Sequence, residues 1–71
     1  MPTVSEKELL VKLQVNSMVS YLVNAFKYSY EDAFSKVVGS NTYHRLLNSN
    51  LYLNQGTLYV LDDFKREFAN S

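Results

Sequence analysis

The chain has 71 residues, which is enough for a single small domain, and its seven basic residues balance its seven acidic ones. A neutral chain lacks the basic excess that supplies most of the affinity for nucleic acids, and the absence of cysteine excludes disulfides and thiolate metal sites. No apolar run approaches the roughly 18 residues of a membrane span, and the first residues do not resemble a secretion signal. We therefore expect a cytoplasmic protein without a membrane segment.

The first predicted element is a long amphipathic helix over residues 6–27. Ser5 and Glu8 form a capping-box pattern at its start. Its apolar residues recur at the spacing of one helix face, which predicts that this face forms the core and that truncating Leu22 or Phe26 is severely destabilising. The residues of this stripe are Val11, Val15, Met18, Val19, Leu22, Val23 and Phe26.

Two shorter helices are predicted to follow. Ser29 can cap a helix whose apolar face continues to Val38, and Gly39 is placed to close that helix in the left-handed conformation. Ser40 then starts a third helix, which the polar residues 48–50 end, because their side chains compete for backbone hydrogen bonds.

The segment over residues 51–60 admits two interpretations. It can form a short β-hairpin with its turn at residues 54–56, or a loop that leads into a last helix capped by Thr57. The apolar residues that favour a last helix are Leu61, Phe64 and Phe68. Together these elements predict an all-α fold: one small helical bundle of about four helices with a long first helix, and either a hairpin or a loop before the last one.

The only histidine, His44, lies between Tyr43 and Arg45. General base catalysis and zinc binding both need further groups close to the histidine, and none stands out in the sequence. We interpret His44 as a residue of a helix surface, and we predict no catalytic residue, no cofactor and no metal site.

Three carboxylates, Asp62, Asp63 and Glu67, gather near the end of the chain beside Lys65 and Arg66. Paired carboxylates can bind a cation. However, Asp62 precedes Arg66 by four residues, and Asp63 and Glu67 lie one helical turn apart. This spacing favours ordinary ion pairing on a solvated helix face, worth about 0.2–0.5 kcal/mol per pair.

The chain has six tyrosines, which is many for its length. Tyrosine joins a large apolar area to a polar tip and is enriched at protein interfaces. The same area also suits a small core, and the sequence favours neither use. The tyrosines that we predict as partner-binding residues are Tyr28, Tyr30, Tyr43, Tyr52 and Tyr59.

The second and third predicted helices, joined by a tight turn at Gly39, can imitate a helix-turn-helix. In this interpretation the residues that contact nucleic acid are Asn41, Thr42, His44 and Arg45. Arg45 would be the only basic anchor, so phosphate contacts would be few, and DNA binding is the alternative rather than the main prediction.

The segment Gly56-Thr57-Leu58-Tyr59-Val60-Leu61-Asp62-Asp63-Phe64 resembles the closing motif of a family of short bacterial proteins of unknown function. That motif consists of glycine, two variable residues, tyrosine, two aliphatic residues, a variable residue, aspartate and an apolar residue. Residues 29–38 are also similar to the second helix of the family. The resemblance implies a small, mainly helical fold without an established activity. It also implies a partner protein, since some relatives are associated by gene position with toxin-like enzymes.

Three functional hypotheses follow from these patterns. We predict a non-enzymatic protein-interaction module, either a homodimer or a partner of another bacterial protein, because so small a core leaves tyrosine and aliphatic side chains uncovered. A helix-turn-helix-like DNA-binding regulator is the alternative. An enzyme that uses His44 with a carboxylate such as Asp63 ranks last, because the sequence indicates no substrate.

Overall fold

A computed structural model of the chain describes residues 4–70, with side chains from residue 6 onward, and every element in this range is an α-helix. The helices are α1 (Val4–Phe26), α2 (Tyr30–Val38), α3 (Asn41–Asn48), α4 (Asn50–Leu53) and α5 (Thr57–Ala69). The all-α prediction with a long first helix is confirmed. The β-hairpin predicted as one interpretation of residues 51–60 is wrong, because this segment holds α4, a short loop and the start of α5.

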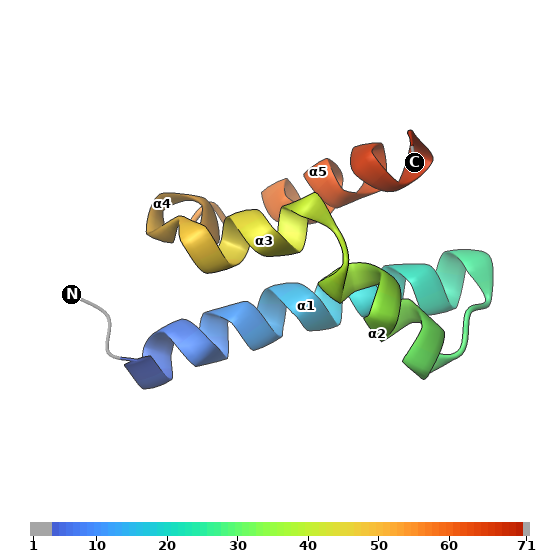
Figure 1. Ribbon diagram of the computed structural model, residues 1–71, viewed down its shortest axis with the longest axis horizontal. Helices are drawn as coiled ribbons and strands as arrows, with labels where there is room; N and C mark the ends of the chain where they lie inside the picture. The colour runs from blue at the N-terminus through green and yellow to red at the C-terminus, as the bar shows by residue number, and fades with distance from the viewer. Residues whose placement is uncertain (1–3, 71) are drawn as a thin grey trace.

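The long helix α1 organises the bundle, since it contacts each of the other four helices. Figure 1 shows α2 turning back along the end of α1, α3 and α4 lying over its first half, and α5 running above them toward the end where α1 finishes. The molecule is elongated, with extents of 37 × 21 × 18 Å. The ends of α1 and α5 and the start of α2 therefore meet at one end of the molecule.

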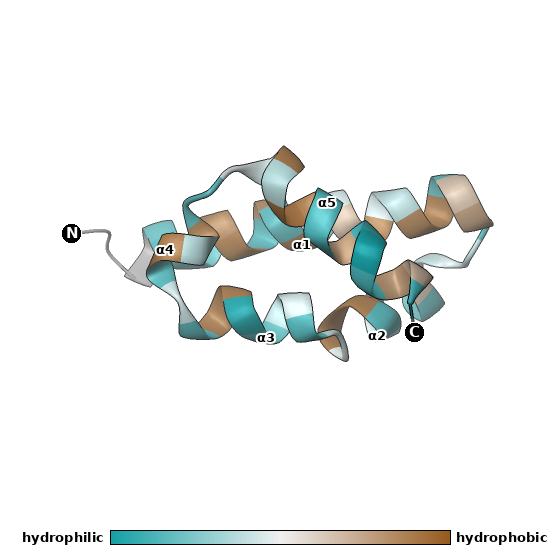
Figure 2. Cartoon of the chain, turned by 90° about the horizontal axis from the view of Figure 1, so that it is seen from above, coloured by the Kyte–Doolittle hydropathy of each residue, from teal (hydrophilic) through white to brown (hydrophobic). Residues whose placement is uncertain are grey.

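The core lies between α1 and the helices that cover it. Figure 2 shows hydrophobic and hydrophilic residues alternating along the helices, as expected for helices with one buried face. Leu22 is fully buried, as predicted, whereas Phe26 is 48 % exposed, so its predicted place in the core is wrong. Phe26 is the last residue of α1, and the rings of Tyr21, Tyr28 and Phe68 cover it only in part. The buried core residues are Val15, Met18, Val19, Leu22, Ala33, Val37, Leu46, Tyr52, Leu53, Val60 and Phe64.

Serine side chains start three of the helices. The hydroxyl of Ser29 accepts the Asp32 N–H at 3.2 Å, which begins α2, and the hydroxyl of Ser40 accepts the Tyr43 N–H at 3.1 Å, which begins α3. Both caps were predicted from the sequence. Ser49 caps α4 in the same way, so the polar residues 48–50, predicted only to end α3, also start the next helix.

Two predicted helix ends differ from the structure. The helix α1 already includes Val4, so it begins before the predicted Ser5 cap, and the side chain of Ser5 lies outside the described residues. Gly39 was predicted to be left-handed but has φ −88°, because the Ser40 N–H donates to Val37 O in a right-handed turn. The left-handed residue at a helix end is Lys27, with φ 61°, after α1.

The loop between α4 and α5 explains why a hairpin does not form. Tyr52 and Leu53 are both buried although they are neighbours, which a strand with one buried face does not allow. Gly56 has φ 102°, a conformation that favours glycine, and it takes the N-cap position of α5. Thr57 therefore lies inside α5 instead of capping it.

Replacing Lys27 by glycine is expected to stabilise the fold. A non-glycine residue in the left-handed region costs roughly 1–2 kcal/mol. This strain exceeds the free-energy cost of the extra backbone entropy that glycine gives to the unfolded chain. We expect Lys27→Gly to raise the free energy of unfolding by up to about 1 kcal/mol in urea denaturation. The control Asn24→Gly, in the interior of α1, should lower it by about 0.5–1 kcal/mol. Equal destabilisation by both substitutions would contradict the left-handed conformation of Lys27.

Candidate interaction surface

Five aromatic side chains from α1, α5 and the turn before α2 meet at the end of the molecule where α1 finishes. We call them the aromatic cluster: Tyr21, Phe26, Tyr28, Phe64 and Phe68. The ring centres of Phe26 and Phe68 are 5.0 Å apart, and that of Tyr28 lies 6.2 Å from each of them. Tyr21 contacts Phe26 edge-on at 5.7 Å. These distances are typical of aromatic pairs that attract one another.

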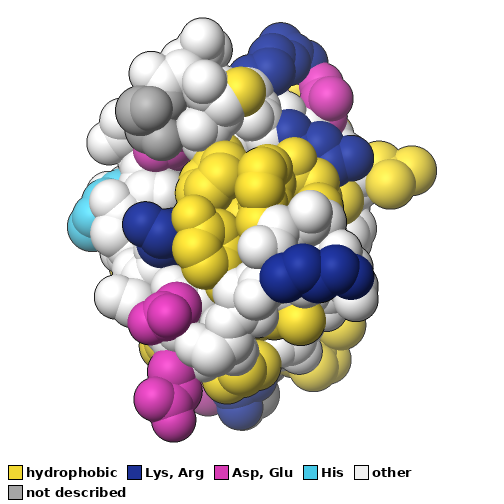
Figure 3. Space-filling model, turned by 90° about the vertical axis from the view of Figure 1, so that its right-hand side faces the viewer, with side chains coloured by type: hydrophobic (Ala, Val, Ile, Leu, Met, Phe, Trp, Pro, Cys, Tyr) yellow, Lys and Arg dark blue, Asp and Glu magenta, His cyan; other side chains and the backbone are white. Residues whose placement is uncertain are grey.

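The aromatic cluster is buried at its base and open at its surface. Phe64 is buried in the core, whereas Tyr21, Tyr28 and Phe68 are only partly buried and Phe26 is 48 % exposed. Figure 3 looks at this end of the molecule and shows a continuous hydrophobic area in its centre. A single exposed apolar residue is ordinary, but an exposed ring surrounded by partly exposed rings forms a contiguous apolar patch of the kind found at binding surfaces.

Lysine side chains border the aromatic cluster. The Lys36 ammonium lies 5.5 Å from the centre of the Tyr28 ring, and the Lys65 ammonium lies 5.0 Å from that of Tyr21. Lys27 directly follows Phe26 in the sequence. All three lysines are exposed, and none takes part in an ion pair in the part of the chain that the structure describes. Figure 3 shows both basic and acidic side chains around the hydrophobic area.

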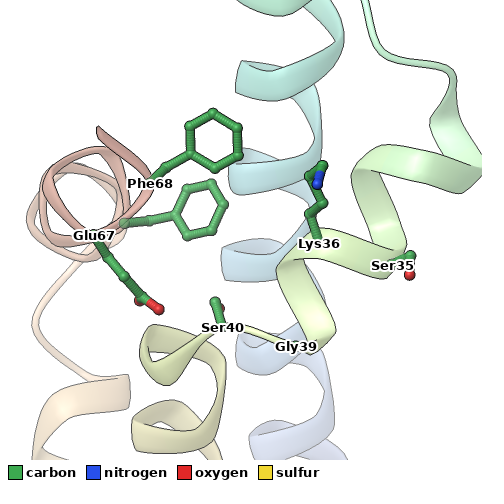
Figure 4. A pocket seen from close by; sticks show the side chains of 7 residues that line it. Ser35, Lys36, Gly39, Ser40, Glu67 and Phe68 are labelled. Carbon is green, nitrogen blue, oxygen red and sulfur yellow. The ribbon is translucent and has the colours of Figure 1, made fainter. Parts of the chain in front are cut away.

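A cleft of about 280 Å³ opens between α2 and α5 beside the aromatic cluster. Figure 4 shows Phe68 on one side of this cleft and Lys36 on the other, while Glu67 extends toward Ser40. Phe64, Phe68 and Lys36 belong both to the cleft and to the surface described above, so the two are continuous. The lining residues are Ser35, Lys36, Gly39, Ser40, Phe64, Glu67 and Phe68.

The carboxylate in this cleft, Glu67, caps α3. It accepts the Asn41 N–H at 2.7 Å, the Thr42 N–H at 2.9 Å and the Thr42 hydroxyl at 2.7 Å. Burial alone would raise the pKa of Glu67, but the hydrogen bonds from Asn41 and Thr42 outweigh burial and lower the pKa below its ordinary value. The prediction that Glu67 belongs to a solvated, ion-paired helix face is therefore wrong.

Asp63 also reaches across to another helix. It accepts the Tyr52 hydroxyl at 2.7 Å and lies 3.7 Å from the Arg45 guanidinium, which itself stacks 4.1 Å from the centre of the Tyr52 ring. Burial, the hydrogen bond to Asp63 and the charge of Asp63 raise the pKa of the Tyr52 hydroxyl far above its ordinary value. Of the three carboxylates, only Asp62 forms the predicted helix-surface ion pair, with Arg66.

The five tyrosines predicted to bind a partner do not share one surface. Tyr28 belongs to the aromatic cluster, whereas Tyr52 is buried in the core. Tyr30 stacks on Phe34 along α2 and Tyr59 packs edge-on against Tyr52, and both are mostly exposed. Tyr43 is half-buried against the core. Sequence reasoning missed Phe26 and Phe68 as surface residues, although the close spacing of Phe26, Tyr28 and Tyr30 was a visible signal.

The four residues assigned to nucleic-acid contact in the alternative hypothesis also have different surroundings. Thr42 is buried, and its backbone N–H and that of Asn41 are occupied by Glu67. Arg45 is engaged with Asp63 and Tyr52, as described above. His44 is exposed on α3, where we placed it from the sequence. The N-terminal turn of α3 thus presents a bound carboxylate where a phosphate would have to approach.

The structure contains neither a metal-binding group nor a membrane-spanning helix within its described residues. No three side chains of histidine, aspartate or glutamate gather closely enough to hold an ion in residues 6–70. Each helix in the described range is too short or too polar to cross a membrane.

The segment that resembles the bacterial family closes the bundle. Gly56 starts α5, Val60 and Phe64 enter the core, and Asp63 binds Tyr52. Each of these motif positions therefore has a structural role in this chain.

The resemblance itself stays a prediction. Comparison of the chain with known protein families, with curated proteins and with solved structures gave no match.

Proposed function

We propose that this protein is a non-enzymatic interaction module that binds another protein chain through the aromatic cluster. The observation that carries the proposal is the position of Phe26. It lies 48 % exposed among the rings of Tyr21, Tyr28 and Phe68, at one end of a bundle whose core the aromatic cluster joins through Phe64. A ring that other rings hold in place is still open to water here. When a partner covers it, the free energy of the complex falls by about 25 cal/mol per Å² of apolar area removed from water.

The composition of this surface supports a protein partner. Aromatic residues are enriched in the centres of protein interfaces, where a few well-packed anchors supply most of the binding energy. Such anchors need little ordering on binding when neighbouring rings already fix their positions. The edge-on and tilted contacts of Phe26 with Tyr21, Tyr28 and Phe68 supply that preorganisation.

The polar groups support a module without catalytic activity. Glu67 holds the start of α3, and Asp63 with Tyr52 joins α5 to α4. His44 is exposed and its neighbouring ring is that of Tyr43. The ionisable groups that a catalytic site would need are therefore engaged in holding helices together, or stand by themselves on the surface.

The proposal can be tested by affinity capture from a lysate of the source cells with two single variants. Phe26→Ala removes the exposed ring of the aromatic cluster, and Leu58→Ala removes an apolar side chain that is 81 % exposed at the start of α5, outside the cluster. We expect the wild type and Leu58→Ala to retain the same stoichiometric protein, and Phe26→Ala to lose it. Sedimentation of the purified protein shows whether that chain is a second copy. Equal capture by all three proteins, or capture by none, would contradict the proposal.

A further inference from the structure

We infer that the partner of the aromatic cluster is a second copy of this chain, paired about a two-fold axis so that Lys36 of each copy faces Asp32 of the other. This inference rests on the proposed function and names the occupant of the surface. The observation that carries it is a pair of opposite charges on one side of α2, beside the open rings, that form no ion pair with each other.

Asp32 and Lys36 lie one helical turn apart on the side of α2 that borders the aromatic cluster. Residues four positions apart share one side of a helix, and the Lys36 ammonium lies 5.5 Å from the centre of the Tyr28 ring. The Ser29 hydroxyl accepts the Asp32 N–H, which fixes the position from which this side chain extends. Both side chains are exposed, and neither forms an ion pair within residues 6–70. A positive and a negative charge are therefore both available to a partner at the edge of the open rings.

A surface that carries both signs of charge can be complementary to itself. In a two-fold interface, residue i of one copy contacts residue j of the other, and j contacts i. When two copies meet with their α2 helices running in opposite directions, each Lys36 faces an Asp32, so that two equal ion pairs form. Two further exposed side chains, Lys27 and Glu31, add a charge of each sign near the cluster. The net charge of zero leaves no overall repulsion between the copies.

The mixed charges disfavour an occupant of one sign. An acidic segment would be attracted by Lys36 but repelled by Asp32, and a basic segment would meet the opposite pair of effects. Like charges brought together at an interface select against that partner. The phosphates of a membrane surface or of a nucleic acid would approach the same carboxylates, Glu31 and Asp32. A second copy instead places an opposite charge against both members of the pair.

The same pairing covers the apolar part of the surface. Phe26 is the most exposed ring of the aromatic cluster, and in the dimer it would pack against the cluster of the other copy. A chain of this size buries only a limited core of its own, so it gains stability from oligomerisation. We therefore expect the purified chain to form a dimer at micromolar concentration.

Sedimentation equilibrium of the purified full chain tests the inference, with circular dichroism to verify that each variant is folded. We expect the wild type to form a dimer and Phe26→Ala to weaken it strongly. Asp32→Lys and Lys36→Asp each place like charges opposite one another, so each should raise the Kd of the dimer by about tenfold or more. Lys12→Asp, at an exposed lysine in the first half of α1, is the matched control and should change the Kd by less than about twofold.

Mixing the two charge variants tests the reciprocal contact directly. The Asp32→Lys chain offers two positive charges at these positions and the Lys36→Asp chain offers two negative ones. An equimolar mixture should therefore form a mixed dimer in which both ion pairs are restored. The double variant D32K/K36D exchanges the two charges within one chain, so it should dimerise with itself nearly as well as the wild type does.

Several results would overturn the inference. They are a wild type that stays monomeric up to millimolar concentration, a dimer that both charge variants leave intact, an equimolar mixture that stays monomeric, or an equal effect of Lys12→Asp. If the wild type is monomeric but Phe26→Ala loses a captured chain of different sequence, the proposed function stands and the second copy is rejected. A dimer that Phe26→Ala leaves intact would place the contact outside the aromatic cluster and reject this occupant of it.

Discussion

Replacing Leu22 by alanine is expected to leave the protein largely unfolded at room temperature. Leu22 is fully buried on the second half of α1, the helix that contacts all the others. Removing a buried leucine side chain typically costs about 2–5 kcal/mol, because the lost burial is compounded by a cavity. A domain of this size has a stability of about 0.05–0.15 kcal/mol per residue, so the loss is a large part of the total.

Far-UV circular dichroism and thermal melting measure this effect, with Phe26→Ala as the control on the same helix. Phe26 is only half covered, so we expect its loss to cost about half as much or less, and the variant to melt cooperatively. A cooperative melt of Leu22→Ala close to that of the wild type would show that the face of α1 around Leu22 is not the core.

The second large effect is expected for Glu67→Gln. The carboxylate accepts three hydrogen bonds from Asn41 and Thr42, and the amide replaces one acceptor oxygen by a donor. Loss of a helix cap costs about 0.5–2 kcal/mol, and hydrogen bonds to charged groups are worth about 1.5–3 kcal/mol each, so we expect a loss of about 2 kcal/mol in urea denaturation. Asp62→Asn, five residues earlier on α5, removes only a surface ion pair and should cost less than about 0.5 kcal/mol. Equal losses in the two variants would contradict the capping role.

The same interaction makes stability depend on pH in a defined direction. The pKa of Glu67 in the folded protein is below its ordinary value of 4.5. The unfolded chain therefore takes up this proton first, so the contribution of Glu67 is complete above that value and is lost as the pH falls through the folded pKa. We expect the stabilities of wild type and Glu67→Gln to converge in acid. A difference that stays constant down to complete protonation would contradict this linkage.

Local rules predicted the helices well where one residue decides the outcome. The serine caps at Ser29 and Ser40 and the buried face around Leu22 depend on spacing within one helix, which a sequence displays directly. The one-turn helix α4 was missed because Ser49 both follows one helix and caps the next. The left-handed residue was assigned to Gly39 but is Lys27, since the path from α1 to α2 is fixed by packing rather than by glycine content.

The candidate surface was less predictable, because it depends on which helix ends meet. Phe26 and Phe68 are 42 positions apart in the chain, and only the arrangement of α1 and α5 brings their rings to 5.0 Å. Asp63 and Glu67 have the spacing of a solvated helix face, yet α3 and α4 supply their partners. Ion pairing within one helix can be predicted from spacing, whereas capping of one helix by another cannot.

The most direct test of the account measures stability and partner capture on the same preparation of Phe26→Ala. If the exposed ring serves binding more than folding, the variant loses only a modest part of its free energy of unfolding and loses the captured protein completely. Leu58→Ala should retain both properties. A Phe26→Ala protein that still captures the partner at wild-type stoichiometry would contradict the account, and the aromatic cluster would then be part of the packing of the bundle end alone.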